Sequence, residues 1–110
     1  MAKLADYTVK GKSGQEYKFE VYPKDSSWNE IPAVYLVTKR TIKPDGGGSH
    51  THIYVGQTDN LKTRHASHHK EECFAKHGAN CICVFQVSSE QARVAIESDI
   101  VAAGGWPCND

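Results

Sequence analysis

Long hydrophobic runs and an excess of either charge are both missing from this sequence. No stretch of about 18 apolar residues occurs, which excludes a helix that crosses a membrane. The opening residues, Met1 to Asp6, also lack the apolar stretch of a secretory signal, so we expect a cytoplasmic chain without membrane contact. Lys and Arg together number 13, and so do Asp and Glu, so the net charge gives no general reason to bind polyanions.

What is present fits one compact domain. With 110 residues, of which 39% are hydrophobic, the chain can bury roughly two thirds of the surface that its unfolded form exposes. Disorder and a second full domain are therefore not expected, and residues 1–110 are treated as a single domain.

Positive charge is concentrated in the middle of the chain. All six histidines lie between His50 and His77, and they titrate near neutral pH. Between residues 35 and 80 the bases are Lys39, Arg40, Lys43, Lys62, Arg64, Lys70 and Lys76, against the acids Asp45, Asp59, Glu71 and Glu72. Any electrostatic attraction to a polyanion must come from this region.

The cysteines are few and irregularly spaced. Cys73, Cys81, Cys83 and Cys108 form no pair of CxxC modules, which argues against a zinc ribbon, and without an export signal we expect four reduced thiols. His65, His69, Cys73 and His77 recur every four residues and could line one helix face. Such a stripe runs along roughly 18 Å and cannot close around one ion, so a zinc or metal-storage protein is a third interpretation that rests on composition.

Hydrophobic periodicity predicts an α+β fold, in which helices flank a small, mainly antiparallel sheet. An N-terminal hairpin is expected, followed by an antiparallel strand pair with a mobile, glycine-rich connection. A helix, a strand, a second helix and a short tail packed back on the body complete the order. The predicted strands are 7–10, 17–22, 33–37, 52–56 and 81–87, the helices 60–77 and 89–103, the loop 39–49 and the tail 106–109. Asp59 is the expected cap of the first helix, and Ser88 with Gln91 has capping-box spacing before the second.

Two tyrosines at the middles of adjacent strands form the most unusual pairing. Tyr35 and Tyr54 are followed by Gly56 and then by a helix that carries Arg64 and His68 one turn apart. A tyrosine pair alone usually reflects sheet packing, and a lone helix arginine usually faces solvent.

Together these residues resemble the GIY-YIG nuclease superfamily, over residues 31–109. The first motif is Ala33-Val34-Tyr35, the second is Tyr54-Val55-Gly56-Gln57-Thr58, and Asn60 to Arg64 is similar to the helix that carries the catalytic arginine. Glu97 stands where the family places its metal-binding glutamate, and Pro107-Cys108-Asn109 resembles its closing asparagine. His68 and His77 fall where some members carry functional histidines. Ala33 replaces the first glycine of the family's pattern, the linker 36–53 is longer than usual, and residues 1–30 form an N-terminal extension to the core 31–110.

The resemblance implies a metal-dependent endonuclease that hydrolyses nucleic-acid phosphodiester bonds, with DNA as the expected partner. Glu97 would hold a single Mg²⁺ or Mn²⁺ ion, and Arg64 would bind a phosphate oxygen. Tyr35 is the expected general base, with Tyr54 as its partner and His68 as a proton relay, while Gly56, His77 and Asn109 support the site. The alternative is a catalytically weak domain of the same fold that binds nucleic acid or a protein, because zero net charge predicts poor affinity for a duplex.

Overall fold

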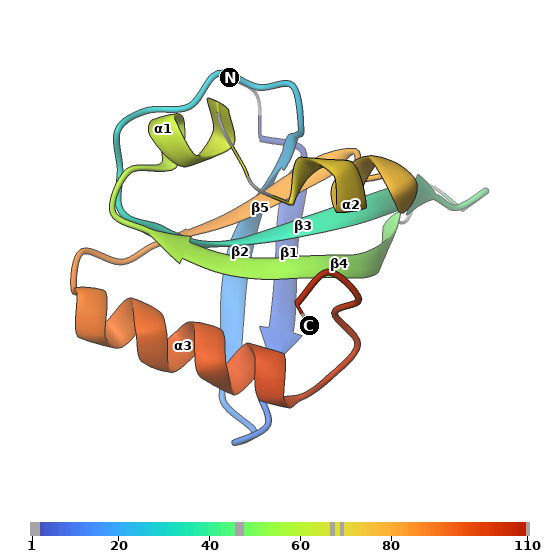
Figure 1. Cartoon of the computed structure of the whole chain (residues 1–110). Coiled ribbons are helices and arrows are strands. Elements are labelled where there is room, and N and C mark those ends of the chain that lie inside the picture. The colour runs from blue at the N-terminus through green and yellow to red at the C-terminus, as the bar shows by residue number, and fades with distance from the viewer. Residues whose placement is uncertain (1–2, 46–47, 67, 69, 110) are drawn as a thin grey trace.

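The sheet is the frame of the molecule, and all of its neighbouring strands are antiparallel. The computed structural model describes residues 3–45, 48–66, 68 and 70–109. Its strands are β1 (Ala5–Lys10), β2 (Glu16–Pro23), β3 (Ala33–Ile42), β4 (Gly48–Thr58) and β5 (Cys81–Gln86), and its helices are α1 (Leu61–Ala66), α2 (Glu71–Lys76) and α3 (Glu90–Ala102). The strand order is β1-β2-β5-β3-β4, with β4 at one edge (Figure 1). The predicted α+β class with an antiparallel sheet is confirmed.

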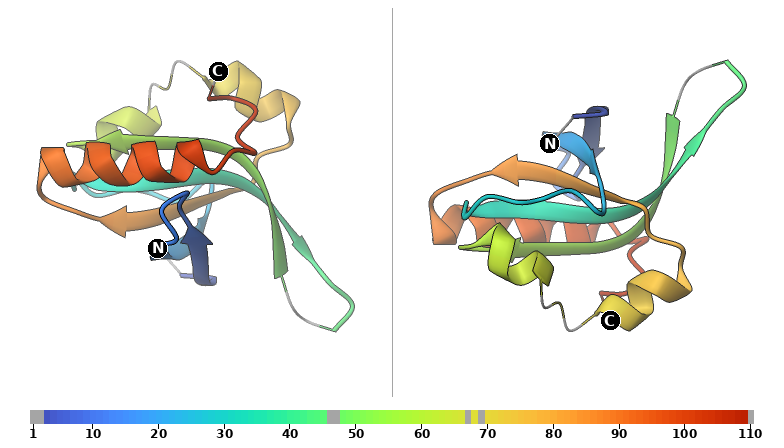
Figure 2. Two further views of the ribbon diagram at one scale, coloured as in Figure 1. Left: turned by 90° about the horizontal axis from the view of Figure 1, so that it is seen from below. Right: turned by 90° about the horizontal axis from the view of Figure 1, so that it is seen from above.

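Helices cover the sheet on both faces. The views in Figure 2 show α3 on one face, with α1 and α2 on the other. The core is divided in the same way, because successive strand side chains point to opposite faces. The face of α1 and α2 buries Trp28, Ala33, Tyr35, Val37, Ile53, Tyr54, Leu61, Phe74, Ile82, Val84 and Cys108, and the face of α3 buries Val9, Phe19, Val21, Val34, Leu36, Val55, Cys81, Cys83, Ile100 and Trp106. Trp28 belongs to the first of these clusters and Trp106 to the second.

The N-terminal hairpin continues the sheet rather than standing apart from it. β1 pairs with β2, and β2 pairs with β5 from Glu20 opposite Val84 to Pro23 opposite Cys81. The extension therefore adds two strands to the sheet. Within the described part of the chain, no helix is both long and apolar enough to cross a membrane.

The central hairpin is longer than predicted. β3 runs to Ile42 and β4 starts at Gly48, so much of the expected loop 39–49 is paired strand that projects from the body (Figure 2). Thr41 and Ile42 have high β-propensity and pair with Ser49 and Gly48, which extends the ladder beyond the predicted strands. Positions 46–47, on which the prediction of a mobile loop also rests, lie outside the described residues.

The predicted helix 60–77 is wrong in one respect, because it is two short helices. Leu61 and Phe74 are both buried, and a single helix of about 3.6 residues per turn would put them on opposite sides. The break between α1 and α2 lets both side chains reach the sheet. The caps are also shifted, since Asn60 rather than Asp59 accepts the Thr63 backbone N–H at 3.1 Å, and Ser89 rather than Ser88 caps α3.

The expectation of four reduced cysteines is wrong. Cys73 and Cys108 form a disulfide that ties α2 to the C-terminal tail, whereas Cys81 and Cys83 are free and buried. The two partners are 35 positions apart and meet because the tail folds back over the sheet, a contact that spacing alone does not reveal. The missing export signal, on which this prediction rested, therefore did not indicate the state of these two cysteines.

Candidate functional site

The two tyrosines of the motifs lie on the same sheet face, beneath α1 and α2. Tyr35 of β3 is opposite Gly56 of β4, and Tyr54 is opposite Val37, so the tyrosines are diagonal neighbours. Their ring centroids are 6.1 Å apart. A register shift in β4 next to Tyr54 marks a β-bulge, which sets the direction of the Tyr54 side chain independently of the strand before it. Both side chains are buried.

His68 contacts both tyrosines from the break between the helices. Its Nε2 lies 2.6 Å from the Tyr35 hydroxyl, and its ring centroid lies 5.1 Å from that of Tyr54. Its other ring nitrogen, Nδ1, accepts the backbone N–H of Lys70 at 3.0 Å. In the neutral imidazole the hydrogen is therefore on Nε2, and it points at the Tyr35 oxygen.

This tautomer changes the role that His68 can take. An Nε2 that carries a hydrogen donates to Tyr35 and cannot at the same time accept the Tyr35 proton. The expectation that His68 sits at the tyrosines agrees with the geometry. The arrangement favours stabilisation of a Tyr35 phenolate over the proton relay expected from the sequence.

Glu97 approaches the site around the free edge of β4. Because β4 is an edge strand, alternate backbone N–H groups point away from the sheet, among them those of Val55 and Gln57. The Val55 N–H donates to Asn109. The Gln57 backbone opposes, in part, the rise that burial causes in the pKa of Glu97. Although α3 packs on the opposite face, the charge of Glu97 acts on both tyrosines across the edge of β4.

The charges of Arg64 and Glu97 both act on the tyrosines. Burial raises the pKa of Tyr35, with smaller contributions from Tyr54 and Glu97, while Arg64 opposes the increase by charge and by a hydrogen bond. Burial and Glu97 raise the pKa of Tyr54, and Arg64 and a hydrogen bond from Tyr35 lower it. Burial also raises the pKa of Glu97, and the Gln57 backbone and Arg64 reduce that shift. Tyr35, Tyr54, Arg64 and Glu97 are thus coupled electrostatically.

Arg93, one turn before Glu97 on α3, does not form a salt bridge with it. The two residues have the spacing of a helix salt bridge, but the Arg93 guanidinium is turned to the carbonyl oxygens of Val87 and Ser88 and to the Gln57 side chain. Among the described residues, no ion pair includes Glu97. Arg93 is buried and has a structural role.

Two of the supporting residues lie elsewhere. Asn109 binds the backbone of Val55 through both ends of its amide, at 2.7 and 2.8 Å, and so pairs the edge of β4 rather than facing the tyrosines. His77 is exposed at the end of α2, next to the Cys73–Cys108 disulfide. Sequence reasoning missed Gln57, which contacts Arg93 by its side chain and Glu97 by its backbone. Its position between Gly56 and Thr58 in the second motif was the available signal.

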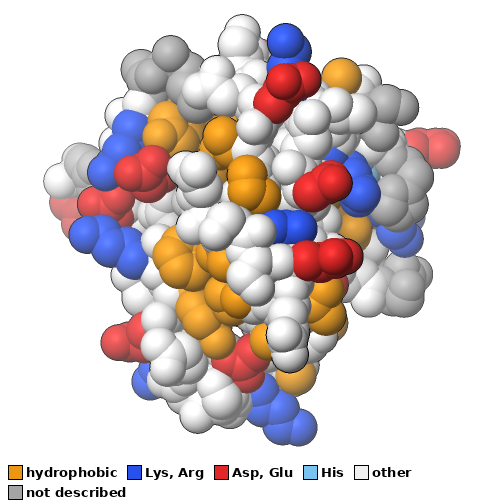
Figure 3. All heavy atoms as spheres, turned by 90° about the vertical axis from the view of Figure 1, so that its left-hand side faces the viewer, with side chains coloured by type: hydrophobic (Ala, Val, Ile, Leu, Met, Phe, Trp, Pro, Cys, Tyr) orange, Lys and Arg blue, Asp and Glu red, His pale blue; other side chains and the backbone are white. Residues whose placement is uncertain are grey.

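Arg64 borders open hollows on the surface. One, of about 240 Å³, is lined by Gln57, Thr58, Asp59, Arg64, Glu90 and Arg93. Figure 3 shows the side of the molecule where α1, the end of β4 and the start of α3 meet, and there acidic and basic side chains are interspersed. Compared with known proteins, the chain matches no protein-family model, no curated protein and no solved structure.

Proposed function

We propose that this chain is a divalent-metal-dependent endonuclease of the GIY-YIG type that hydrolyses phosphodiester bonds, with DNA as the substrate. The observation that carries the proposal is the pair Tyr35 and Tyr54, with ring centroids 6.1 Å apart and His68 at the Tyr35 hydroxyl. The charges of Arg64 and Glu97 act on both tyrosines, and the four residues come from β3, β4, α1 and α3. Residues that only pack a core do not need a carboxylate and a guanidinium beside two tyrosines.

The donor chemistry at Glu97 fits a hard cation. Glu97 is half-buried and belongs to no ion pair among the described residues. Its pKa is raised, because burial outweighs the opposing effects of the Gln57 backbone and Arg64. A single Mg²⁺ or Mn²⁺ held by one protein carboxylate, with water and phosphate oxygens completing its shell, suits this setting. Such an ion, when bound, supplies charge neutralisation at the phosphate and stabilises the leaving oxygen.

Arg64 and the tyrosines would then act on the substrate. Arg64 is half-buried and borders the open hollows, so its guanidinium can bind a nonbridging phosphate oxygen as negative charge develops there. Tyr35 would accept the proton of the attacking water, which requires its phenolate form. The Nε2 hydrogen of His68 and the charge of Arg64 favour that form, whereas burial opposes it.

Cleavage of a supercoiled plasmid, with and without Mg²⁺, tests the proposal. We expect wild-type cleavage that requires the metal, loss of cleavage in Glu97→Gln, and a fall of about 100-fold in Arg64→Ala, because that change removes stabilisation of the transition state. Glu72→Gln and Lys62→Ala are matched controls, since both residues are exposed and lie away from the tyrosines. Equal cleavage by wild type and Glu97→Gln would reject the metal assignment.

A catalytically weak nucleic-acid- or protein-binding domain of the same fold is the second candidate. The raised pKa of both tyrosines favours it, as do the interspersed acidic and basic side chains on the face that Figure 3 shows. It becomes the better conclusion if the wild type cleaves no duplex, single-stranded or branched nucleic acid in Mg²⁺ or Mn²⁺. A cytoplasmic location stays a prediction of the sequence.

A further inference from the structure

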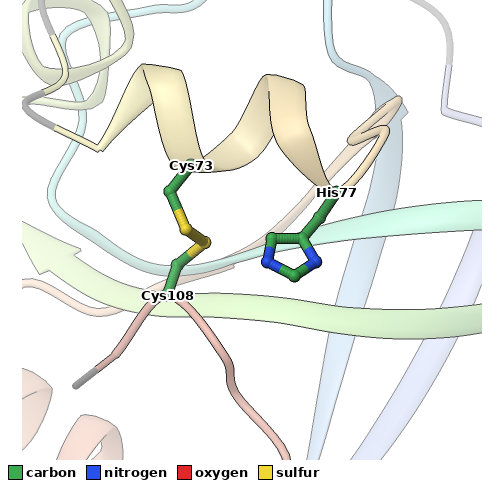
Figure 4. A group of neighbouring side chains, drawn as sticks. All are labelled: Cys73, His77 and Cys108. Atoms are coloured by element: carbon green, nitrogen blue, oxygen red, sulfur yellow. A yellow bond between two sulfur atoms is a disulfide. The ribbon is translucent and has the colours of Figure 1, made fainter.

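A second cluster of reactive side chains lies where α2 meets the C-terminal tail. Figure 4 shows Cys73 and Cys108 joined by their disulfide, with the His77 imidazole beside them. One ligand atom from each of the three residues lies within 4.8 Å of the other two. Two atoms bound tetrahedrally to zinc at about 2.0–2.3 Å are themselves about 3.3–3.8 Å apart, so small movements bring this group to a coordination geometry.

The placement of the three residues does not depend on the disulfide alone. Cys73 lies in α2, and His77 is the C-cap of that helix four positions further on, so both side chains lie on the same side of it (Figure 4). Cys108 is held by its backbone N–H, which donates to the Ile53 carbonyl at 2.9 Å, and by its neighbour Asn109 on Val55. The tail is also anchored by Trp106, whose indole N–H donates to Ile100. We therefore expect Cys108 to stay beside Cys73 after reduction.

We propose that the reduced protein binds one Zn²⁺ ion through the sulfur atoms of Cys73 and Cys108 and the imidazole of His77, with a fourth position open to water. Reduction comes first: a dithiol gives two electrons and two protons to the disulfide and is itself oxidised to a disulfide. The two thiols then release their protons as the ion binds, and the two thiolates balance its charge. This site shares Cys73 and His77 with the predicted stripe but takes its third ligand, Cys108, from the C-terminal tail.

The exposure of the ligands fits an ion that enters from one side. Cys108 is buried, Cys73 is half-buried and His77 is exposed, and a hollow lined by Lys70, Glu72, Cys73 and Lys76 opens beside the cluster. A reductant and then an ion can reach the sulfur of Cys73 through this hollow. Cys83 is a poor competitor, since burial raises the pKa of its thiol to about 12. The ion would take over the role of the disulfide and link α2 to the tail under reducing conditions.

Metal titration of the reduced chain tests the proposal. The protein is reduced with a dithiol, freed of reductant and metal without oxygen, and titrated with Co²⁺ and then with Zn²⁺ against a chromogenic chelator. We expect one equivalent to bind, with thiolate-to-cobalt charge transfer and the intense visible bands of tetrahedral Co²⁺. His77→Ala should weaken Zn²⁺ binding by more than about 100-fold, beyond the usual loss when an outer partner of a ligand is removed. Cys81→Ser should bind as the wild type does.

Three outcomes overturn the proposal. The first is a reduced chain that keeps its near-ultraviolet circular dichroism and binds no Co²⁺, and the second is His77→Ala protein that binds Zn²⁺ as tightly as the wild type. If reduction unfolds the chain, Zn²⁺ must restore the folded signal, because binding and folding are then coupled, and failure to do so is the third. The oxidised protein should bind no Zn²⁺ at these residues. None of these results depends on nuclease activity.

Discussion

The ring of Tyr35 lies so close to Gly56 that a side chain at this position of β4 would displace it. A Cβ atom on Gly56 would be 2.5 Å from both Cζ and the hydroxyl oxygen of Tyr35, and 2.8 Å from Cε2 of Tyr54. Gly56 is not one of the described glycines that have a positive φ. Steric contact with the two tyrosines, rather than backbone conformation, therefore accounts for the glycine of the second motif.

Gly56→Ala should disable the site without unfolding the protein. The new methyl group must displace the Tyr35 hydroxyl, and misplacement of about 1 Å lowers rates by about 100-fold. Plasmid cleavage and the midpoint of urea unfolding measure the two effects. Gly14→Ala is the matched control, because Gly14 has a φ of 91° in the N-terminal turn, where alanine is strained but touches nothing of the site. Full cleavage by Gly56→Ala would show that the Tyr35 position is irrelevant to activity.

His68→Phe should make cleavage more dependent on alkaline pH. Phenylalanine keeps a ring beside Tyr54 and removes the Nε2 hydrogen that points at the Tyr35 oxygen. Burial already raises the pKa of Tyr35, so loss of this donor moves that pKa further up and leaves less phenolate at any given pH. The pH–rate profile measures the shift, with a spectroscopic titration of the tyrosines beside it. His68→Gln keeps an N–H donor and should fall between the two proteins, whereas superimposable profiles would contradict the donor role.

Lys39 and Lys43 should contribute to binding of nucleic acid through its phosphates. Both are exposed on the central hairpin, whose end projects from the body (Figure 2). If each contacts one phosphate, the double substitution Lys39→Ala, Lys43→Ala lowers the slope of log K against log salt by about 1.8 and weakens all duplex sequences alike. Fluorescence anisotropy over a salt series gives the slope. Lys10→Ala and Lys12→Ala on the N-terminal hairpin should leave it unchanged, and an unaltered slope in the first protein would exclude the hairpin from the interface.

Local pattern predicted much of the fold, because each strand carries its own apolar alternation. Tyr35 and Tyr54 could be placed on paired strands, since a hairpin joins neighbours in the chain. The division of the helix 60–77 could not be predicted in this way. It follows from the packing of Leu61 and Phe74 on the sheet, which local sequence patterns do not reveal. The Cys73–Cys108 disulfide depends likewise on the path of the tail.

The candidate site was predicted as a set of residues but not as a set of contacts. The resemblance supplied Arg64 and Glu97, whereas the reason that Glu97 is free of Arg93 lies in the carbonyl groups that surround the guanidinium. The Lys70 N–H that fixes the His68 tautomer is a backbone group, and no side-chain pattern indicates it. Among the described residues, neither His77 nor Asn109 contacts the tyrosines, so no contact supports the catalytic role expected for them.

Glu97→Gln should be more stable than the wild type at neutral pH, and this is the outcome that best separates a functional carboxylate from a structural one. Burial raises the pKa of Glu97 above its ordinary value of 4.5, so the folded chain binds this proton more tightly than the unfolded chain does. The free energy of unfolding therefore falls as pH rises from 4.5 through the raised pKa. Well below 4.5 the carboxyl group is protonated in both states, and its burial no longer destabilises the fold. In urea unfolding at pH 7 the glutamine protein should have the higher midpoint, and the difference should shrink as the pH approaches 4.

Mg²⁺ that binds only the folded state should stabilise the wild type but not Glu97→Gln. Glu72→Gln, at an exposed position, should show neither effect. A Glu97→Gln protein that is less stable at pH 7 would mean that the carboxylate holds the β4 edge together through Gln57, and that no ion is needed to explain why it is there.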